Sequence, residues 1–304
     1  MAPLLDCLIV GGGPAGLTAA IYLARFHLAL RIVDAGDSRA ALIPLTRNHA
    51  GYPGGISGRE LLRRMREQAA EFGAEVISGT IERIEWQGSA FSADLGGRAL
   101  QARTILLATG VVNNRPDLAP SLHDHALARG LIRYCPICDG YEVTDKNVGV
   151  LGTHSHGCNE AIFLRMFTKN VTLIAPDSLH DLSPTERERL GGLNVRIVDG
   201  PCATLRVEHD AIVVPTPAGN IPFDTLYPAL GSRIRSELAI ALGARVSPDG
   251  CLLVDPHQRT SIPGLYAAGD VSKGLDQISH AMGEAGVAAT TIRNDLAENG
   301  PLAR

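Results

Sequence analysis

The 304-residue sequence contains few aromatic side chains and no long apolar segment. Phe, Trp and Tyr make up 4% of the residues, whereas glycine occurs 33 times. This balance is typical of a nucleotide-binding α/β protein, in which glycine-rich turns follow strands, rather than of a β-sandwich. No apolar run approaches the ~20 residues that a membrane-spanning helix needs. We therefore expect a protein without a membrane segment.

An excess of positive charge is also missing. Lys and Arg together number 28 and Asp and Glu 32, which gives a formal net charge of -4. No basic tract and no basic stripe with interleaved aromatic residues is present, which argues against nucleic acid as a partner. The first residues do not form a basic region followed by an apolar region and a cleavage site, and residues 4–10 have the pattern of a strand. These features predict a cytoplasmic protein.

Cysteine is infrequent as well, with six in the chain. In a reducing cytoplasm six cysteines do not form a structural disulfide framework. Two of them, Cys135 and Cys138, are separated by two residues, and Asp139 follows directly. A CxxC pair in such a compartment is typically catalytic or binds a metal.

Three other interpretations of this CxxC pair compete with a redox function. A zinc site needs two further ligands at metal spacing, but Cys158 and Cys202 are isolated and the histidines at 154–156 are too closely spaced. A c-type haem signature needs a histidine at the position of Asp139. The third interpretation is a pair of inert buried thiols.

The redox interpretation is the one we favour. A thiolate is the attacking species in disulfide exchange, and its pKa falls when a helix terminus or a partner group stabilises it. Asp139 is the nearest group that can protonate a leaving thiolate or deprotonate an incoming thiol. The predicted catalytic residues are therefore Cys135, Cys138 and Asp139.

A glycine-rich turn near the N-terminus predicts a dinucleotide site. Gly11, Gly13 and Gly16 match the G-x-G-x-x-G pattern between an expected strand over residues 4–10 and an expected helix over residues 17–26. In this motif the glycines permit a tight turn, a close approach of the backbone to a pyrophosphate, and close packing of helix and strand. The helix N-terminus adds amide donors for the pyrophosphate. The motif alone does not separate FAD from NAD.

The rest of the chain repeats this alternation of strands and helices. A second strand over residues 29–34 ends on Asp34, which could accept the ribose hydroxyls of an adenosine. Further along, the patterns predict a helix over 59–72, strands over 74–84, 90–94 and 103–109, a second strand–turn–helix–strand unit over 148–151, 152–157, 158–167 and 171–174, and a final strand and helix over 264–268 and 281–296.

Five segments carry a resemblance to a known family. They are residues 11–22, 51–54, 108–110, 135–140 and 262–271. In these segments, and over essentially its full length, the sequence resembles the low-molecular-weight thioredoxin reductases and their thioredoxin-reductase-like relatives. The resemblance implies an α/β fold with two Rossmann-like (three-layer ββα) nucleotide-binding domains, the second inserted into the first. It implies an FAD-binding domain formed by residues 1–114 and 218–304, and an NAD(P)H-binding-like domain over 115–217 that carries the CxxC pair.

The resemblance also implies roles for single residues. Asp34 would bind the adenosine ribose, Asp270 the ribityl chain, and Gln277 would lie near the isoalloxazine ring. Cys138 would face the flavin and Cys135 would exchange with the substrate. The remaining positions of the implied FAD site, the first five of them at the pyrophosphate turn or next to it, are Gly11, Gly13, Pro14, Ala15, Gly16, Asn48, Thr109, Gly110 and Gly269. The family is homodimeric, so we expect a homodimer.

The sequence departs from the family at the second nucleotide site. His154 stands at the middle glycine position of the turn over 152–157, where a side chain would occupy the space that the pyrophosphate needs. Residues 175–181 contain two acids and no arginine for a 2′-phosphate. NADH binding remains possible through Asp177, and a rearranged turn could still bind NADPH. NAD(P)H is therefore a doubtful cofactor.

The sequence thus predicts an enzyme, an FAD-dependent disulfide oxidoreductase. Electrons would move between the flavin, the Cys135/Cys138 disulfide and a thioredoxin-like protein or a small dithiol or disulfide. The altered nicotinamide site favours a donor other than NADPH, or dithiol oxidase activity. An ordinary NADPH-dependent thioredoxin reductase is the first alternative, and a flavin-binding redox sensor without turnover is an alternative of another class.

Overall fold

A computed structural model describes residues 4–298, 300 and 302. The chain divides into two compact units, the first formed by Met1–Leu45, His49–Val112 and Ile234–Arg304, the second by Thr46–Asn48 and Asn113–Arg233. The segments that join the units, β7 (Val111–Asn113) and β15 (Ser232–Ile234), pair as a two-stranded sheet. Over the described part of the chain, none of the helices has both the length and the apolar character needed to cross a bilayer.

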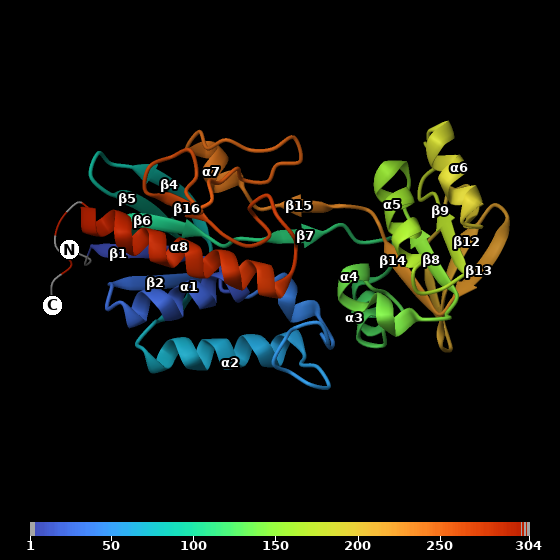
Figure 1. Ribbon diagram of the computed structural model, residues 1–304, viewed down its shortest axis with the longest axis horizontal. Coiled ribbons are helices and arrows are strands. Elements are labelled where there is room, and N and C mark those ends of the chain that lie inside the picture. The colour runs from blue at the N-terminus through green and yellow to red at the C-terminus, as the bar shows by residue number, and fades with distance from the viewer. Residues whose placement is uncertain (1–3, 299, 301, 303–304) are drawn as a thin grey trace. The chain divides into compact units, whose positions relative to one another are not determined.

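The first unit is built on one sheet with a parallel part and an antiparallel part (Figure 1). The parallel strands, in spatial order, are β3 (Val76–Ser78), β2 (Leu30–Asp34), β1 (Leu5–Val10), β6 (Arg98–Leu107) and β16 (Leu265–Ala267). The antiparallel strands β5 (Phe91–Leu95) and β4 (Ile81–Trp86) continue from the other end of β6. Strand β1 is buried at nearly every position, as expected of a strand covered on both faces.

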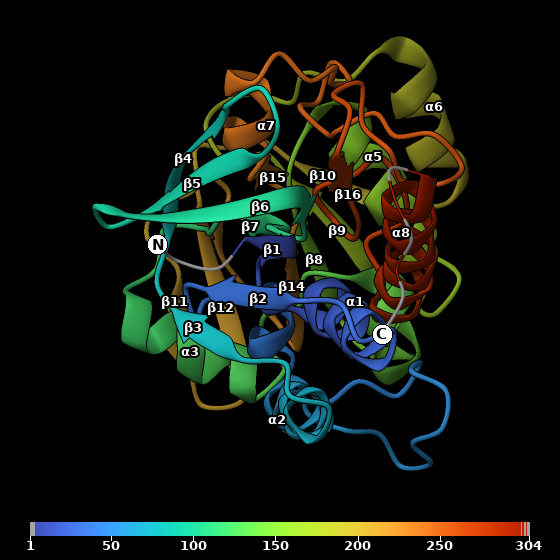
Figure 2. The same ribbon diagram turned by 90° about the vertical axis from the view of Figure 1, so that its left-hand side faces the viewer.

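Helices cover one face of this sheet, and β5 and β4 extend the sheet from β6. The covering helices are α1 (Pro14–Arg25), α2 (Gly58–Glu71) and α8 (Ile278–Glu298), and in Figure 2 α1 and α8 lie to the right of the strands. Small buried residues such as Ala19, Ala20 and Ala285 allow α1 and α8 to pack closely. A second core holds Leu8, Phe91 and their neighbours together with α7 (Glu237–Ala241). The short helix η1 (Arg39–Leu42) precedes α2.

The second unit has its own core and two sheets. The parallel sheet has the order β10 (Arg196–Val198), β9 (Val171–Ile174), β8 (Val148–Leu151) and β14 (Thr225–Pro228). The antiparallel sheet consists of β11 (Arg206–Glu208), β12 (Ala211–Thr216) and β13 (Gly219–Phe223). The helices are α3 (Pro120–Ala128), α4 (Pro136–Asp139), η2 (Gly140–Val143), α5 (His154–Leu164) and α6 (Pro184–Gly192).

The predicted fold class is confirmed: the chain is an α/β protein with parallel sheets of the Rossmann type. Two local predictions were wrong. The segment 74–84 forms two strands, β3 and β4, because Gly79 between them has a φ of 153° and turns the chain. The helix expected over 158–167 begins at His154 and ends at Leu164, so that part of the expected turn over 152–157 is helical.

The second unit also extends further than the sequence suggested. It continues to Arg233, whereas residue 217 was the expected end of the inserted domain. The reason is strand pairing: β13 forms a hairpin with β12, and β14 adds to β8 as the last strand of the parallel sheet.

Candidate functional site

The turn between β1 and α1 forms a glycine cradle in the first unit. Gly11 has a φ of 113°, and a Cβ added there would lie 2.2 Å from the Ala108 carbonyl oxygen. A Cβ on Gly16 would lie 1.9 Å from the carbonyl oxygen of Gly11, so only glycine permits this contact between helix and strand. Helix α1 starts with Pro14, and its N-cap Gly13 provides no side-chain cap. The amides of the first turn are therefore not capped by their own N-cap side chain, which leaves donors for an anion.

Asp34 lies at the end of β2 and is 7% exposed. Its Oδ1 accepts hydrogen bonds from the amides of Gly12, over 3.3 Å, and Gly36, over 3.1 Å. Its Oδ2 accepts a hydrogen bond from Arg66 Nη2 over 2.5 Å. The arginine comes from α2, and no sequence signal placed it beside Asp34. The carboxylate thus shapes the glycine turn, and its contact with an adenosine ribose stays a prediction.

The C-terminal segment comes to the same place in the first unit. A Cβ on Gly269 would lie 3.0 Å from the Cβ of Ala15, so this segment contacts the start of α1. The Gly269 amide donates to Glu284 Oε2 over 2.7 Å. The glutamate is on α8 and holds the turn that carries Asp270. The cradle and the Asp270 turn, predicted separately from distant parts of the sequence, therefore lie together.

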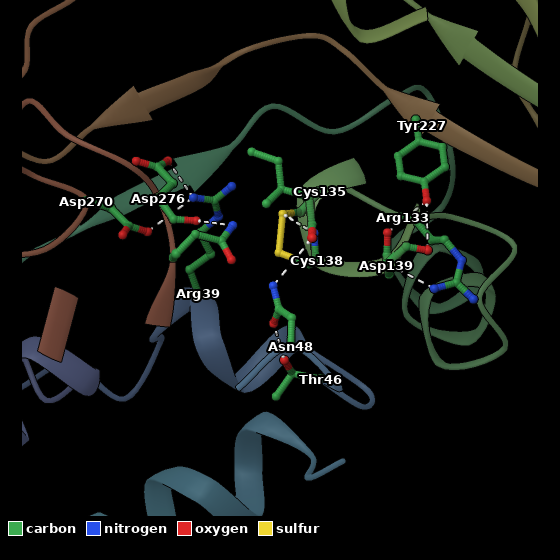
Figure 3. The surroundings of a disulfide bond; sticks show 12 residues. Arg39, Thr46, Asn48, Arg133, Cys135, Cys138, Asp139, Tyr227, Asp270 and Asp276 are labelled. Atoms are coloured by element: carbon green, nitrogen blue, oxygen red, sulfur yellow. Dashed lines mark hydrogen bonds and ion pairs between the residues drawn. A yellow bond between two sulfur atoms is a disulfide. The ribbon is translucent and has the colours of Figure 1, made fainter. Parts of the chain in front are cut away.

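Asp270 is paired with Arg39 at this turn. Arg39 Nη1 lies 3.1 Å from Asp270 Oδ2 and 2.7 Å from Asp276 Oδ2, so one guanidinium bridges two carboxylates (Figure 3). Burial raises the pKa of Asp270, with a further contribution from the neighbouring charge of Asp276. Nothing in the sequence of η1 marks Arg39 as a partner of a residue so far along the chain.

The other predicted flavin residues are distributed between the two units. Thr109 Oγ1 donates to the Arg235 carbonyl over 2.6 Å. Gly110 has a φ of 66°. The Gln277 carbonyl accepts the amide of Ala281, so Gln277 lies at the start of α8. Asn48 is grouped with the second unit, where its Oδ1 accepts a hydrogen bond from Thr46 Oγ1 over 2.8 Å.

These residues of the first unit fit a flavin dinucleotide. The cradle offers uncapped amides at a helix N-terminus and lacks the Cβ atoms that would block a pyrophosphate. Asp270 offers a partly buried carboxylate beside the cradle for hydroxyl groups. The donor set of the cradle suits the phosphates of FAD, and Asp270 suits a hydroxylated chain.

Cys135 and Cys138 form a disulfide in the second unit. Cys135 is the N-cap of the short helix α4, and its Sγ accepts a hydrogen bond from the Cys138 amide over 3.1 Å. An amide that points at sulfur favours its anionic form, so this contact would stabilise a thiolate on Cys135 after the disulfide opens. Among residues 4–298, 300 and 302, no group of three or more His, Cys, Asp or Glu side chains is arranged to hold a metal ion.

Asp139 is held by two donors from outside α4. Tyr227 OH donates to Asp139 Oδ1 over 2.7 Å, and Arg133 Nη1 lies 3.0 Å from Asp139 Oδ2. Figure 3 shows the carboxylate directed toward these two side chains. Burial raises the pKa of Asp139, and the charge of Arg133 opposes that rise. Arg133 lies two residues before the CxxC pair and could have been considered, whereas Tyr227 on β14 gave no signal.

The second glycine turn keeps two of its three glycines. A Cβ on Gly152 would lie 2.7 Å from the Ala229 carbonyl oxygen, and a Cβ on Gly157 would lie 2.8 Å from the carbonyl carbon of Gly152. Both glycines therefore serve packing between β8, α5 and β14. His154 takes the middle glycine position and has a φ of 54°, in the left-handed region that favours glycine.

His154 is tied to the loop after β9. Its amide donates to the Asp181 carbonyl over 3.2 Å, and its Nδ1 lies 3.3 Å from Asp181 Oδ2. The Asp181 amide in turn donates to Thr153 Oγ1 over 3.0 Å. Thr153 is the N-cap of α5. A carboxylate thus stands beside the start of α5, where the helix would otherwise favour an anionic ligand.

Comparison with known proteins agrees with this geometry. A family model described as pyridine nucleotide-disulphide oxidoreductase matches residues 5–285. The thioredoxin reductase of Streptomyces coelicolor is 30% identical over 287 residues, which cover 89% of this chain and 87% of that protein. The bifunctional thioredoxin reductase/thioredoxin of Mycobacterium leprae is 30% identical over 312 residues, which cover 97% of this chain and 66% of that protein. The crystal structure of thioredoxin reductase from Streptococcus pyogenes matches with a TM-score of 0.90 and 27% identity, covering 98% of this chain and all of that one.

The fold and the site thus define a flavin-dependent disulfide oxidoreductase. The chain belongs to the pyridine nucleotide-disulphide oxidoreductase family, and within it resembles the thioredoxin reductases. Membership implies FAD as the cofactor, and the Cys135–Cys138 disulfide has the position of a redox-active pair. The predicted family and enzyme class are confirmed.

Proposed function

We propose that this protein is a thioredoxin-reductase-like flavoenzyme whose nicotinamide site is degraded. It would use an electron donor other than NADPH, or work as a dithiol oxidase. The observation that carries the proposal is the left-handed His154 at the middle glycine position of the second turn, bound to Asp181 through its backbone and its side chain.

The second glycine turn retains the glycines that the fold requires but not the one that a bound nucleotide requires. Gly152 and Gly157 still make the close contacts of a Rossmann turn. The position at which the backbone would approach a pyrophosphate carries an imidazole instead. Asp181 adds a negative charge beside the N-cap of α5, which repels phosphate groups. Both changes weaken the binding of NADH and of NADPH alike.

The loop after β9 disfavours the binding of NADPH in particular. Residues 175–181 contain Asp177 and Asp181 and no arginine, and both acids are exposed. A 2′-phosphate needs positive charge in this loop, whereas two carboxylates repel it. NADH, which lacks this phosphate, would be less affected than NADPH.

The redox chemistry would take place at Cys135 and Cys138, with Asp139 as the proton carrier. FAD, when bound, supplies the exchange of two electrons. The Cys138 amide favours a thiolate on Cys135, which suits this sulfur for exchange with the substrate. The residues that we propose for FAD are those of the cradle and its surroundings: Gly11, Gly13, Pro14, Ala15, Gly16, Asp34, Asn48, Thr109, Gly110, Gly269, Asp270 and Gln277.

We propose a thioredoxin-like protein or a small dithiol or disulfide as the substrate. The relative from Mycobacterium leprae, which joins a thioredoxin reductase to a thioredoxin, supports the protein substrate. The altered turn supports a small dithiol, because a dithiol can supply electrons without a nicotinamide. A homodimer is expected from the family resemblance, and sedimentation of the purified flavoprotein would measure its state.

The test is an anaerobic titration of the flavoprotein with NADPH, NADH and a dithiol, each added separately, while the flavin absorbance is followed. We expect the dithiol to bleach the flavin and NADPH to act slowly or not at all. Readmission of oxygen with excess dithiol then separates an oxidase, which consumes oxygen continuously, from an enzyme that waits for a protein substrate. Rapid bleaching by NADPH would instead establish an ordinary thioredoxin reductase, and no bleaching by any of the three would favour a redox sensor.

A further inference from the structure

A second carboxyl group lies buried near Asp139 in the second unit. Glu160 is on α5, and its side chain is 12% exposed. Its Oε1 is fully buried and has no hydrogen-bond partner among the described residues. Its Oε2 lies 3.9 Å from His156 Nε2, one helical turn earlier. Disulfide exchange at Cys135 and Cys138 with Asp139 as the proton carrier does not by itself involve this group.

The elements that pack around Glu160 carry several charged and titratable groups. Asp139 is on α4 and Tyr227 on β14, and both interact electrostatically with Glu160. Arg133 and Glu142, which precedes β8 on η2, act on Asp139. His156 lies on α5 itself and is 62% exposed. The cluster therefore runs from the surface of α5 to the acid beside the disulfide.

The carboxyl groups of Asp139 and Glu160 differ in the hydrogen bonds that they accept. Asp139 accepts hydrogen bonds from Tyr227 and Arg133, so its anion is compensated. Glu160 has an oxygen without any donor, and a buried carboxylate without partners is costly. Burial and the negative charge of Asp139 raise the pKa of Glu160 to about 7. Below about pH 7 Glu160 is therefore largely protonated.

We propose that Glu160 is a positioning residue of the redox centre, which stores the proton that Asp139 exchanges with the Cys135–Cys138 pair and reloads it from solvent through His156. The proposal rests on the acid–base role of Asp139 in the proposed function. It assigns a use to a buried acid whose unpartnered oxygen would otherwise only destabilise the fold.

The proton balance of disulfide opening needs such a store. When a substrate thiolate attacks Cys135, a mixed disulfide forms, the Cys135–Cys138 bond breaks, and Cys138 leaves with the electron pair as a thiolate. Glu160 passes its proton to Asp139, and Asp139 passes it on to this thiolate. Solvent then returns a proton to the ionised Glu160 by way of the exposed His156. Closing the disulfide sends the proton along the same groups in the opposite direction.

The experiment measures how fast dithiothreitol opens the disulfide of the purified flavoprotein across neutral pH, with the products trapped by alkylation and counted by mass spectrometry. Glu160→Gln keeps the shape and cannot donate an acidic proton. Glu188→Gln is the matched control, because Glu188 is an exposed glutamate on α6 of the same unit. The rate of each variant is divided by the wild-type rate at the same pH. This ratio removes the effect of the ionisation of dithiothreitol itself.

We expect the disulfide of Glu160→Gln to open about tenfold more slowly than that of the wild type below the pKa of Glu160. This loss is smaller than the roughly 100-fold or greater effect of a group that transfers the proton directly, because Glu160 acts through Asp139. The ratio should approach one above that pKa, because the ionised wild-type group has no proton to give. His156→Ala should slow the reaction, and added imidazole should restore it. Glu188→Gln should match the wild type at every pH.

Infrared difference spectra give a second measure that does not depend on reaction. A protonated buried carboxyl should lose its carbonyl band as the pH rises through neutrality, and Glu160→Gln should lack this band. The proposal is overturned if the band persists in Glu160→Gln, or if its rate ratio is the same at all pH values. It is likewise overturned if the substitution changes only nicotinamide affinity. Neither measurement uses flavin reduction, so an error in the proposed electron donor would appear only in the flavin titration.

Discussion

The hydroxyl of Tyr227 donates a hydrogen bond to Asp139 Oδ1 over 2.7 Å, although 88 residues separate the two in sequence. The bond links the acid that follows the CxxC pair to β14, the last strand of the parallel sheet in the second unit. Arg133 binds the other carboxylate oxygen. The protonation of Asp139 therefore depends in part on Tyr227, which only the folded chain brings to it.

Loss of this hydroxyl should shift the titration of Asp139. A hydrogen bond to a charged group contributes about 1.5–3 kcal/mol, and about 1.4 kcal/mol corresponds to one pKa unit. In Tyr227→Phe the pKa of Asp139, already raised by burial, should rise by about one further unit. The acid limb of the pH profile of disulfide opening should move to higher pH by the same amount. Tyr141→Phe, at an exposed tyrosine, is the control, and equal profiles for both variants would contradict the prediction.

Restoring glycine in the second turn should restore nucleotide binding. His154→Gly removes the imidazole from the pyrophosphate position and relieves a left-handed conformation that costs a non-glycine residue about 1 kcal/mol or more. We expect the affinity for NADH, measured by fluorescence titration, to rise by about tenfold, equal to about 1.4 kcal/mol. The affinity for NADPH should rise less, because Asp177 remains. Ser155→Gly changes the neighbouring exposed residue and should have no such effect.

The opposite result for this turn would also be clear. If the wild type already binds NADPH tightly and His154→Gly leaves the affinity unchanged, the turn is not obstructed. The proposal of a degraded nicotinamide site would then be wrong.

A methyl group at Gly16 should remove the flavin. The added Cβ would lie 1.9 Å from the backbone oxygen of Gly11, and backbone cannot move aside as a flexible side chain can. We expect the FAD content of Gly16→Ala after gel filtration to be lower than that of the wild type by about tenfold or more. A tenfold loss of affinity corresponds to about 1.4 kcal/mol of binding free energy. Gly191→Ala on α6 is the control, because its added methyl meets no atom within 4 Å. Full flavin content in Gly16→Ala would show that the cradle is not the pyrophosphate site.

The buried acid should make stability depend on pH. The pKa of Glu160 is raised from 4.5 to about 7 in the folded protein, so the folded state binds its proton more tightly than the unfolded state. Its favourable contribution is complete below the unfolded pKa and is lost as the pH rises to the folded pKa. The loss amounts to roughly 3 kcal/mol at about 1.4 kcal/mol per unit.

Urea unfolding at several pH values measures this effect. The free energy of unfolding of the wild type should fall relative to that of Glu160→Gln between the two pKa values. Above neutral pH the difference should be constant. A difference that does not vary with pH would mean that Glu160 is ionised throughout, or that its pKa is not raised.

Most of the architecture and the type of chemistry could be predicted from the sequence, because both depend on local patterns. The mostly apolar residues 4–10 predicted a buried strand, and the glycine pattern at 11–16 follows from the close approach of backbone atoms that the structure confirms. The CxxC pair with its following acid indicated a redox disulfide without any tertiary information.

The tertiary structure decided which groups tune that chemistry. Tyr227, Arg66 and Arg39 bind acids of the predicted site from distant parts of the chain, and the sequence contains no periodic signal for such pairs. It also decided that α5 begins at His154, because the contacts with Asp181 and Thr153 start the helix earlier than its composition suggests. Local patterns report on burial and turns, whereas the pKa of a buried acid depends on its neighbours in space.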